Sequence, residues 1–418
     1  MTIDPYAPAA RDLVGLYQDL HAHPELSFQE TRTAAIVANH LRKLGYQTTT
    51  GVGQTGVVGI LHNGQGPTAL LRADMDGLPV QEQTGLAYAS GARGTARDGY
   101  EVPVMHACGH DMHVSCLLGA CRALAENREA WSGRLMVVFQ PAEEIGAGAK
   151  AMVDDGLFER FGRPDVVLGQ HVVPFPVRFL ALHPGIAHAA ADNVKITMVG
   201  KGGHGGLPET SIDPVVMAAA TVMRLQTVVS REVSGTDTAV VTVGVMRAGT
   251  SASIIPDHAE LLLSVRTVSE GVRTRVLDAI TRIARAEAAA SGATEDPQVQ
   301  LMERFPAVHN DEAASAHTQA AFTALLGEGK VIDPGLIPAA EDVGLLATAS
   351  GAPCVFWLLG GADPKAFATA TSAEEVGTIA RGLPVNHSPL YAPVIDPTLS
   401  VGIAALVTAT QTWLPPTT

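Results

Sequence analysis

The sequence predicts an α/β fold with two domains, and three observations support this expectation. A chain of 418 residues is long for a single hydrophobic core. Segments whose apolar residues have helical spacing alternate with short apolar runs that favour strands. A second series of elements starts near Ala190, and its βαββαβ-like order is typical of a small α/β sandwich. We therefore expect a larger domain, residues 1–189 and 305–418, interrupted by a smaller one, residues 190–304.

The individual elements follow from the same periodic patterns. Helices of the larger domain are expected over 7–20, 30–44, from Asp111 onward, over 311–325 and over 397–412. Its strands are expected at Val57–Leu61, Thr68–Leu71, Arg134–Phe139, Asp165–Gly169 and Cys354–Leu359. In the smaller domain we expect strands at Asn193–Val199, near 238–246 and 258–266, and over 297–302, with helices over 214–229 and 271–290.

The composition is that of an ordinary globular protein, with 46% hydrophobic and 17% charged residues. The net charge of −14 argues against a nucleic-acid partner, which would require a basic face. We expect no membrane span, because no apolar run reaches about 18 residues. We expect no secretory signal either, because Met1–Ala10 lacks a basic segment followed by an apolar one. With only four cysteines, free thiols in a reducing, cytoplasmic setting are the simpler expectation.

The segment His106–His113 places one thiol, three imidazoles and one carboxylate within a few residues. Each of these groups needs a partner once it is buried, so such density is rarely useful in a hydrophobic core. Cys108 and His110 lie two residues apart, so in an extended segment their side chains would point to the same side and could bind one metal ion. The helix expected after Asp111 places them at a helix start. Ordinary hydrogen bonds of these side chains remain an alternative at this point.

Acidic residues and a histidine follow three of the expected strands. Asp74 and Asp76 could orient metal-bound imidazoles, or they could cap a turn. Glu143 and Glu144 are neighbours whose side chains diverge, so one could bind a metal ion while the other serves as general base in metal-assisted hydrolysis. A solvated charge pair is the alternative. His171 lies where the fourth strand is expected to stop. Because ligands of open α/β sheets bind beyond the carboxyl ends of strands, we expect one site here.

Three further histidine segments are notable. His204 is flanked by glycines in Gly200–Gly206, which would leave it on an exposed loop. The likeness to a phosphate-binding loop is weak, because no Gly-Lys-Ser/Thr follows. His387 precedes a Ser-Pro turn and is a weak signal by itself. His21 and His23 have the spacing of ligands, but we favour a structural role at the end of the first helix.

The candidate ligands outnumber those of a single catalytic zinc site, which keeps three protein ligands and an open position. They suit two divalent ions about 3.5–4 Å apart that share a hydroxide, as in two-metal hydrolases. A thiolate among the ligands favours zinc-like metals over magnesium or calcium. We therefore predict two divalent ions, with zinc, manganese, cobalt and nickel as candidates. The candidate ligands are Cys108, His110, Glu144, His171 and His387, with Glu143 as the candidate base.

The order of the motifs resembles the aminoacylase/carboxypeptidase family of metal-dependent amidohydrolases. The motifs are Arg-Ala-Asp-Met-Asp, His-Ala-Cys-Gly-His-Asp, Gln-Pro-Ala-Glu-Glu, Gly-Gln-His, Gly-Lys-Gly-Gly-His and Asn-His-Ser-Pro. The resemblance runs from His21 to His387 and is closest to the branch of hippurate hydrolases, N-acyl-amino-acid amidohydrolases and auxin-conjugate hydrolases. It implies a mixed-sheet, dinuclear-metal hydrolase domain interrupted by a lid or dimerisation domain, and therefore a homodimer.

The resemblance also implies roles for individual residues. The five candidate ligands would hold the two metals, and supporting hydrogen bonds would come from Asp74, Asp76 and Asp111. Glu143 would take the proton of the metal-bound water and pass it to the leaving amine. His204 would be presented, often across a dimer interface, to the oxyanion of the tetrahedral intermediate. The implied reaction is hydrolysis of an N-acyl amino acid by metal-bound hydroxide, which yields a carboxylic acid and a free amino acid.

One position departs from the family pattern. Ser253 stands before Ile-Ile-Pro-Asp, where relatives usually have Asn. In relatives this Asn and the Arg matching Arg266 hold the carboxylate of the substrate, and Arg266 is retained. We expect an altered substrate preference rather than lost activity. Dipeptidase, carboxypeptidase and N-acetyl-diamino-acid deacetylase activities are alternatives that use the same machinery. A non-enzymatic metal-binding protein is disfavoured, because binding alone needs no general base such as Glu143.

Overall fold

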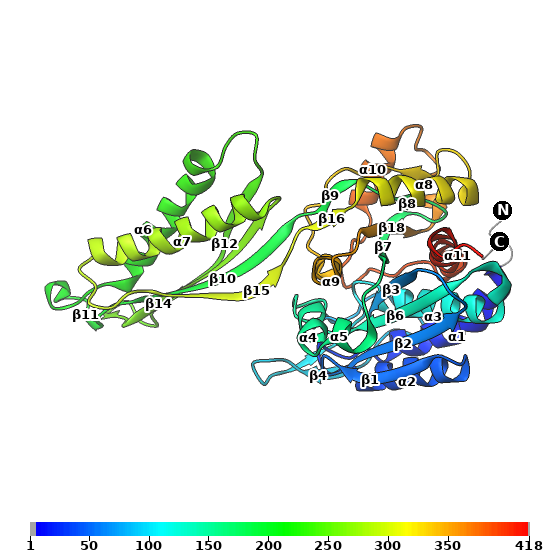
Figure 1. The fold of residues 1–418 in the computed structure, drawn as a ribbon. Coiled ribbons are helices and arrows are strands. Elements are labelled where there is room, and N and C mark those ends of the chain that lie inside the picture. The colour runs from blue at the N-terminus through cyan, green and yellow to red at the C-terminus, as the bar shows by residue number, and fades with distance from the viewer. Residues whose placement is uncertain (1–5, 417–418) are drawn as a thin grey trace. The chain divides into compact units, whose positions relative to one another are not determined.

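The computed structural model describes residues 6–416, which form two compact units. Of the described residues, unit 1 comprises those within Met1–Ala187, Val308–Leu336 and Asp342–Thr418. Unit 2 comprises His188–Ala307 and the short segment Ile337–Glu341. Both units combine helices with a β-sheet (Figure 1), so the α/β class expected from the sequence is confirmed.

Unit 1 is built on a mixed sheet of eight strands in the order β1-β2-β6-β3-β7-β18-β8-β17. The four central strands, β6, β3, β7 and β18, are parallel to one another, whereas β1 and β2 extend the sheet in antiparallel pairing. The parallel strands run as nearly continuous buried segments, as expected for a sheet that is covered on both faces. The bounds are β1 Gln47–Val52, β2 Gly56–Asn63, β3 Thr68–Asp74, β6 Gly133–Gln140, β7 Val166–Pro176, β8 Leu180–Ala181, β17 Val331–Ile332 and β18 Cys354–Ala362.

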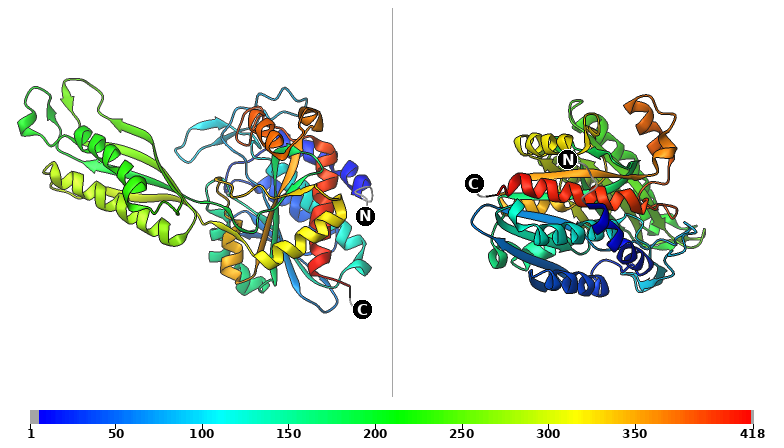
Figure 2. Two further views of the ribbon diagram at one scale, coloured as in Figure 1. Left: turned by 90° about the horizontal axis from the view of Figure 1, so that it is seen from above. Right: turned by 90° about the vertical axis from the view of Figure 1, so that its right-hand side faces the viewer.

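Helices cover both faces of this sheet (Figures 1 and 2). Each face of the sheet packs against its own cluster of buried hydrophobic residues, one larger than the other. Successive side chains of β3 point to opposite faces, so Leu71 packs into the larger cluster and Leu70 into the smaller one. The larger cluster includes α1 Ala7–Ala22, α2 Thr31–Lys43, α3 His110–Glu126, α8 Glu312–Leu326 and α11 Ile395–Trp413. The smaller cluster includes α4 Gly148–Asp154, α5 Leu157–Phe161 and α9 Val343–Ser350. Shorter elements are β4 Arg93–Thr95, β5 Glu101–Pro103, β9 Gly185–His188, β16 Val308–Asn310 and α10 Ala373–Gly382.

Unit 2 is an antiparallel sheet with two helices packed on one face. Along β14 the buried Leu261, Leu263 and Val265 alternate with half-exposed residues, so one face of the sheet meets the helices and the other does not. The chain order is β10, α6, β12, β14, α7, β15, which is the expected βαββαβ pattern. The bounds are β10 Ala190–Val199, α6 Pro214–Thr227, β12 Ala239–Ala248, β14 His258–Thr267, α7 Glu270–Ala290 and β15 Gln298–Phe305. A two-stranded ribbon joins β11 Gly203–His204 to β13 Ile254–Ile255.

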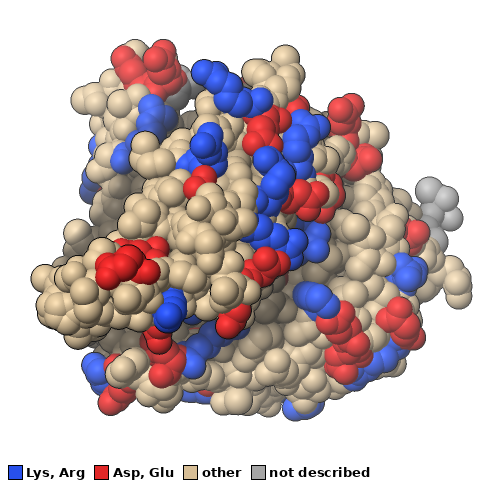
Figure 3. All heavy atoms as spheres, turned by 90° about the vertical axis from the view of Figure 1, so that its left-hand side faces the viewer, with Lys and Arg blue, Asp and Glu red and all other residues tan. Residues whose placement is uncertain are grey.

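Charged side chains of both signs share the surface. On the face that Figure 3 shows, Lys and Arg lie intermixed with Asp and Glu. Within α3, Arg122 pairs with Glu126 at the four-residue spacing that places side chains on the same helix face. Among the described residues, no helix is long and apolar enough to cross a membrane.

One buried ion pair should contribute strongly to the stability of unit 2. Arg273 of α7 donates from Nε to Asp192 of β10 at 2.7 Å and from Nη2 at 2.5 Å, and both side chains are almost fully buried. We predict that Asp192→Ala lowers the free energy of unfolding of unit 2 by about 3–5 kcal/mol, because the guanidinium stays buried without its partner. Hydrogen–deuterium exchange of β10 and α7 peptides measures this loss. Glu270→Ala is the control, since its exposed carboxylate touches the same guanidinium and should contribute less than about 1 kcal/mol. Equal losses in the two variants would contradict the prediction.

Candidate metal centre

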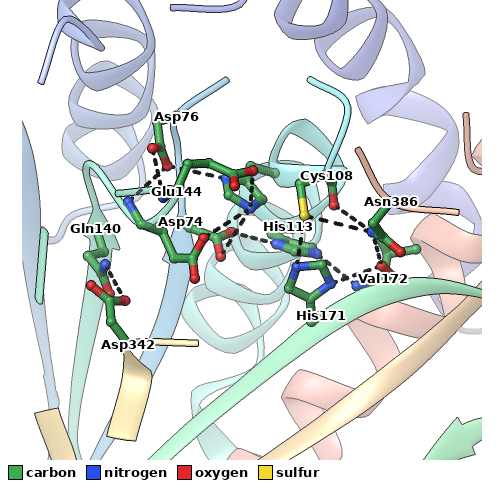
Figure 4. A network of polar contacts seen from close by, with 12 residues as sticks. Asp74, Asp76, Cys108, His113, Gln140, Glu144, His171, Val172, Asp342 and Asn386 are labelled. Carbon is green, nitrogen blue, oxygen red and sulfur yellow. Dashed lines mark hydrogen bonds and ion pairs between the residues drawn. The ribbon is translucent and has the colours of Figure 1, made fainter. Parts of the chain in front are cut away.

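The candidate ligands of unit 1 come from the turn after β6, from β7, from the start of α3 and from the loop around His387, and they meet near the carboxyl ends of the central strands. Glu144 follows the end of β6, and His110 is the first residue of α3. His171 lies within β7 and not at its end as expected, because β7 continues to pair with β18 as far as Pro176. The turn before α3 requires glycine at Gly109, where φ is +83° and a Cβ would lie 2.4 Å from the Val172 side chain. This close approach brings the helix start against β7 (Figure 4).

All five candidate ligands lie together. Ligand atoms of Cys108, His110 and Glu144 fall within 4.8 Å of one another. The Sγ atom of Cys108 is 3.4 Å from Nε2 of His171. The Nε2 atom of His387 is 3.4 Å from Oε2 of Glu144. Glu143, the candidate base, is buried, and its Oε2 lies 3.9 Å from Nε2 of His110.

The donor atoms fit divalent metal ions. Both ring nitrogens of His110 and the Oε1 atom of Glu144 are buried, and none of the three has a hydrogen-bond partner among the described residues. Leaving such atoms without a hydrogen bond is costly, and a cation bound between Nε2 of His110 and Oε1 of Glu144 would satisfy both, while Nδ1 of His110 faces the carboxylate of Asp76. Burial, together with the charges of Asp76 and Asp74, raises the pKa of Glu144. This concentration of negative charge is what a divalent cation would neutralise.

His113 lies among these groups but is occupied by other contacts. Its Nδ1 atom is 2.5 Å from Oδ1 of Asp74, and its Nε2 atom accepts the backbone N–H of Val172 at 2.8 Å. With one nitrogen donating and the other accepting, the neutral ring has no lone pair left for a metal. His113 therefore supports the centre by fixing Asp74 against β7. One sequence signal could have indicated this role, because the residue lies three positions after His110, on the same side of α3.

Besides Asp74, two carboxylates, Asp76 and Asp111, were expected to support the ligands, and both have defined contacts. Asp76 accepts the backbone N–H groups of Glu143 and Glu144, each at 3.1 Å, and its Oδ1 lies 3.3 Å from Nδ1 of His110. Asp111 contacts His21, whose Nδ1 atom is 2.6 Å from its Oδ2. Asp76 thus holds the turn that carries both glutamates.

His21 belongs to a buried ion network at the end of α1 and not to the ligand set. Its second nitrogen lies 3.1 Å from Oε1 of Glu82. Burial by itself lowers the pKa of His21, but the hydrogen bonds and charges of Asp111 and Glu82 outweigh it and raise the pKa to about 10. His23 points elsewhere, with Nδ1 2.8 Å from the carbonyl oxygen of Asp19.

A second buried network, which sequence reasoning missed, fixes Asp74 from the other side. Arg72 is fully buried and donates to Asp74 at 2.6 Å, to Gln140 at 2.9 Å and to Asp342 at 3.1 Å. Gln140 in turn donates to Asp342 at 2.7 Å. Burial raises the pKa of Asp74, but the charges of Arg72 and the neighbouring histidines outweigh it and hold this pKa well below its usual range. Asp74 therefore stays ionised beside the ligands.

Asn386 is a further residue that sequence reasoning missed. Its Nδ2 atom donates to the backbone oxygens of Cys108 at 3.1 Å and Val172 at 3.0 Å. It thereby ties the loop that carries His387 to the segment before α3 and to β7. His387 itself has φ +72°, a conformation uncommon outside glycine, and its N–H donates to the carbonyl of Ala107 at 2.8 Å.

The remaining three candidates lie in unit 2. His204 is exposed in β11, and its Nδ1 atom accepts the N–H of Gly206 at 2.9 Å, so in the neutral ring Nε2 carries the hydrogen. Arg266 lies on β14, and its Nη1 atom is buried without a hydrogen-bond partner among the described residues. Ser253 is exposed, with its Oγ atom 3.3 Å from that of Ser251.

We predict that Cys108→Ser lowers the metal content of the purified protein, because a hydroxyl replaces the thiolate that favours zinc-like ions. Elemental analysis after dialysis against metal-free buffer measures the bound metal. Cys121→Ala is the matched control, because Cys121 is also a buried thiol of α3 but lies in the hydrophobic core. Full metal content in Cys108→Ser would remove this residue from the ligand set.

Comparisons with known proteins agree with this site. The family described as Peptidase family M20/M25/M40 matches residues 70–382. The chain is 39% identical over 323 residues to hippurate hydrolase of Campylobacter jejuni, covering 75% of this chain and 80% of that protein. It is 37% identical over 335 residues to N-acetyl-L-cysteine deacetylase of Bacillus subtilis, covering 79% and 76%. A dinuclear metal binding peptidase of B. subtilis has a similar structure, with a TM-score of 0.73, 28% identity and coverage of 96% and 98%. These likenesses confirm the resemblance seen in the motifs, and the chain belongs to peptidase family M20/M25/M40 as a metal-dependent amidohydrolase.

Proposed function

We propose that this enzyme hydrolyses the amide bond of N-acyl amino acids and releases a carboxylic acid and a free amino acid. The observation that carries the proposal is the pair Glu143 and Glu144 on one turn. Glu144 contributes to the ligand cluster an oxygen that has no hydrogen-bond partner among the described residues and lies 3.7 Å from Nε2 of His110. Glu143 brings a second buried carboxylate to within 3.9 Å of the same nitrogen. One carboxylate for the metal and one for the proton is the arrangement that metal-assisted hydrolysis needs.

Each residue of the proposed active site has a separate role in the reaction. Two divalent ions, when bound, would polarise the acyl carbonyl and lower the pKa of a water molecule. They would be held by Cys108, His110, Glu144, His171 and His387. Glu143 accepts the proton of the attacking water and later donates it to the nitrogen of the leaving amine. His204 donates a hydrogen bond from Nε2 to the oxyanion that develops on the acyl carbon. The Gly206 N–H supports this role, because it keeps the proton of the neutral ring on Nε2.

Recognition of the substrate carboxylate is assigned to Arg266. Arg266 is half-buried, and its Nη1 atom is buried without a hydrogen-bond partner among the described residues, which suits a carboxylate ligand that can accept two parallel hydrogen bonds. Ser253, in place of the Asn usual in relatives, offers a short hydroxyl and no amide N–H. We propose that this replacement shifts the preferred amino acid or acyl group and leaves the reaction unchanged.

The setting of the enzyme is proposed from the same residues. All four cysteines are free thiols, which supports a reducing, cytoplasmic location. The thiolate of Cys108 supports a borderline-soft metal, with zinc, manganese, cobalt and nickel as candidates. We propose a homodimer in which unit 2 serves as the lid or dimerisation domain.

Metal removal and reloading test the proposal. The protein is stripped with a chelator, reloaded with zinc, manganese, cobalt or nickel, and assayed for amine release from hippurate and a panel of other N-acyl amino acids. We expect activity only after reloading, and its loss in Glu143→Gln with the metal content unchanged, because the amide cannot accept the proton of the water. Dipeptides and N-acetyl-diamino acids are assayed in parallel. Turnover of these compounds alone would replace the proposed substrate class.

We predict that His204→Ala lowers kcat by roughly 10²–10³, the usual effect of losing one oxyanion donor, and leaves the metal content intact. Steady-state kinetics and elemental analysis on the same preparation measure the two effects. His258→Ala is the matched control, because His258 is another exposed histidine of unit 2, paired with Asp257. Full activity in His204→Ala would exclude this residue from the reaction.

A further inference from the structure

The turn that carries the two glutamates is held by an unusual set of hydrogen bonds. Three consecutive backbone N–H groups, those of Ala142, Glu143 and Glu144, all donate to carboxylates. Asp76 accepts the second and third. The first, that of Ala142, donates at 2.8 Å to Oε1 of Glu30, which lies far away in the sequence, just before α2.

Ala142 needs this support because its backbone is strained. Its φ is +48°, in the left-handed region, where a residue with a Cβ costs roughly 1–2 kcal/mol. Such a conformation persists only where the surroundings enforce it. Ala142 is fully buried, so its N–H has no access to water as an alternative partner. The residue immediately precedes Glu143, so its backbone angles set the direction in which the Glu143 side chain leaves the turn.

Glu30 is built into its place as a hydrogen-bond acceptor. Its side chain is fully buried, Oε1 also accepts the N–H of Phe28 at 2.9 Å, and Oε2 accepts the hydroxyl of Thr55 at 2.5 Å. Phe28, like Ala142, has a positive φ, +63°. A single carboxylate oxygen therefore fixes two left-handed residues from two separate segments. Burial and the charge of Asp76 raise the pKa of Glu30, but Oε1 remains an acceptor whether or not Oε2 carries a proton.

We propose that Glu30 is a positioning residue for the general base: by accepting the N–H of Ala142, it holds the left-handed turn that aims Glu143 at the attacking water. This inference rests on the proposed role of Glu143. Asp76 anchors the N–H groups of both glutamates, whereas Glu30 holds Ala142, which adjoins Glu143 and not Glu144. The geometry therefore assigns Glu30 mainly to the orientation of the base and only secondarily to the retention of metal.

The decisive variant is Glu30→Met, which keeps the volume of the side chain and removes both acceptors. We expect kcat to fall about 10- to 100-fold, the effect of losing one or two hydrogen bonds to a charged group, while KM and metal content stay at the wild-type level. Hydrogen–deuterium exchange supplies a readout independent of activity: the peptide covering residues 140–148 should lose protection. Unchanged kcat, or a loss of kcat that follows a loss of metal, would overturn the proposal.

Two companion variants separate positioning from simple destabilisation. Glu30→Gln keeps an acceptor at Oε1 and should retain wild-type kcat and exchange protection. Thr55→Val removes only the bond to Oε2 and should lower the unfolding temperature without a comparable loss of kcat. If Glu30→Met does not fold, the outcome for Glu30→Gln tests the proposal. A loss of kcat in Glu30→Gln, with the backbone of the turn still fully protected from exchange, would show that the charge of Glu30 matters and not its hydrogen-bond acceptor. That result would contradict the proposal.

A double variant tests the strain directly. Glycine adopts φ +48° without a penalty, so adding Ala142→Gly to Glu30→Met should restore part of the lost kcat. No recovery would argue against a role exerted through Ala142. If the wild-type enzyme hydrolyses none of the N-acyl amino acids tested, the proposed function fails, whereas the exchange comparison of wild type with Glu30→Met still reports whether Glu30 holds the turn.

Discussion

Buried negative charge is the constraint on which the rest of unit 1 depends. Asp74, Asp76 and Glu144 lie almost entirely out of water, where a carboxylate is unstable unless its oxygens gain partners. The structure provides partners of three kinds: the guanidinium of Arg72, the imidazole of His113 and consecutive backbone N–H groups. Metal ions would supply the remaining positive charge. A site that concentrates so many acidic groups requires rigid surroundings whose hydrogen-bond donors and cations already contact the carboxylates.

The strand order makes those partners available. Because β3 lies between β6 and β7, Arg72 stands opposite Val138 on one side and Gly169 on the other. From this central position its guanidinium reaches Gln140 at the end of β6 and Asp342 beyond it, while the last residue of β3, Asp74, faces α3. Helices on both faces exclude water from these contacts. The strand order thus brings the guanidinium of Arg72 and several carboxylates together near the carboxyl ends of the central strands, where water is excluded.

The sequence was sufficient for the main elements and for the motif-borne residues, but it did not predict β1, α4, α5, α9 or α10. Helical and alternating periodicities located each of the expected helices and strands, because those signals are local. The dense segment around Cys108 and the glutamate pair were visible for the same reason. The supporting contacts were not visible in the sequence. Arg72 pairs with Asp342 across 270 positions, and Glu30 contacts Ala142 across 112 positions. No periodicity marks such pairs, since only the folded chain makes them neighbours. The continuation of β7 beyond His171 was also missed, because it depends on pairing with β18.

The insertion of unit 2 into unit 1 has a consequence for how the enzyme is made. Asn386, which ties its loop to Cys108, stands 278 positions later in the chain, and the whole of unit 2 is translated between them. The acidic residues Asp74, Asp76, Glu143 and Glu144 therefore emerge from the ribosome long before His387 is synthesised. During that interval the nascent chain carries several carboxylates whose final partners do not yet exist. The loop that carries Asn386 and His387 can therefore pack against Cys108 only after the last part of the polypeptide has emerged.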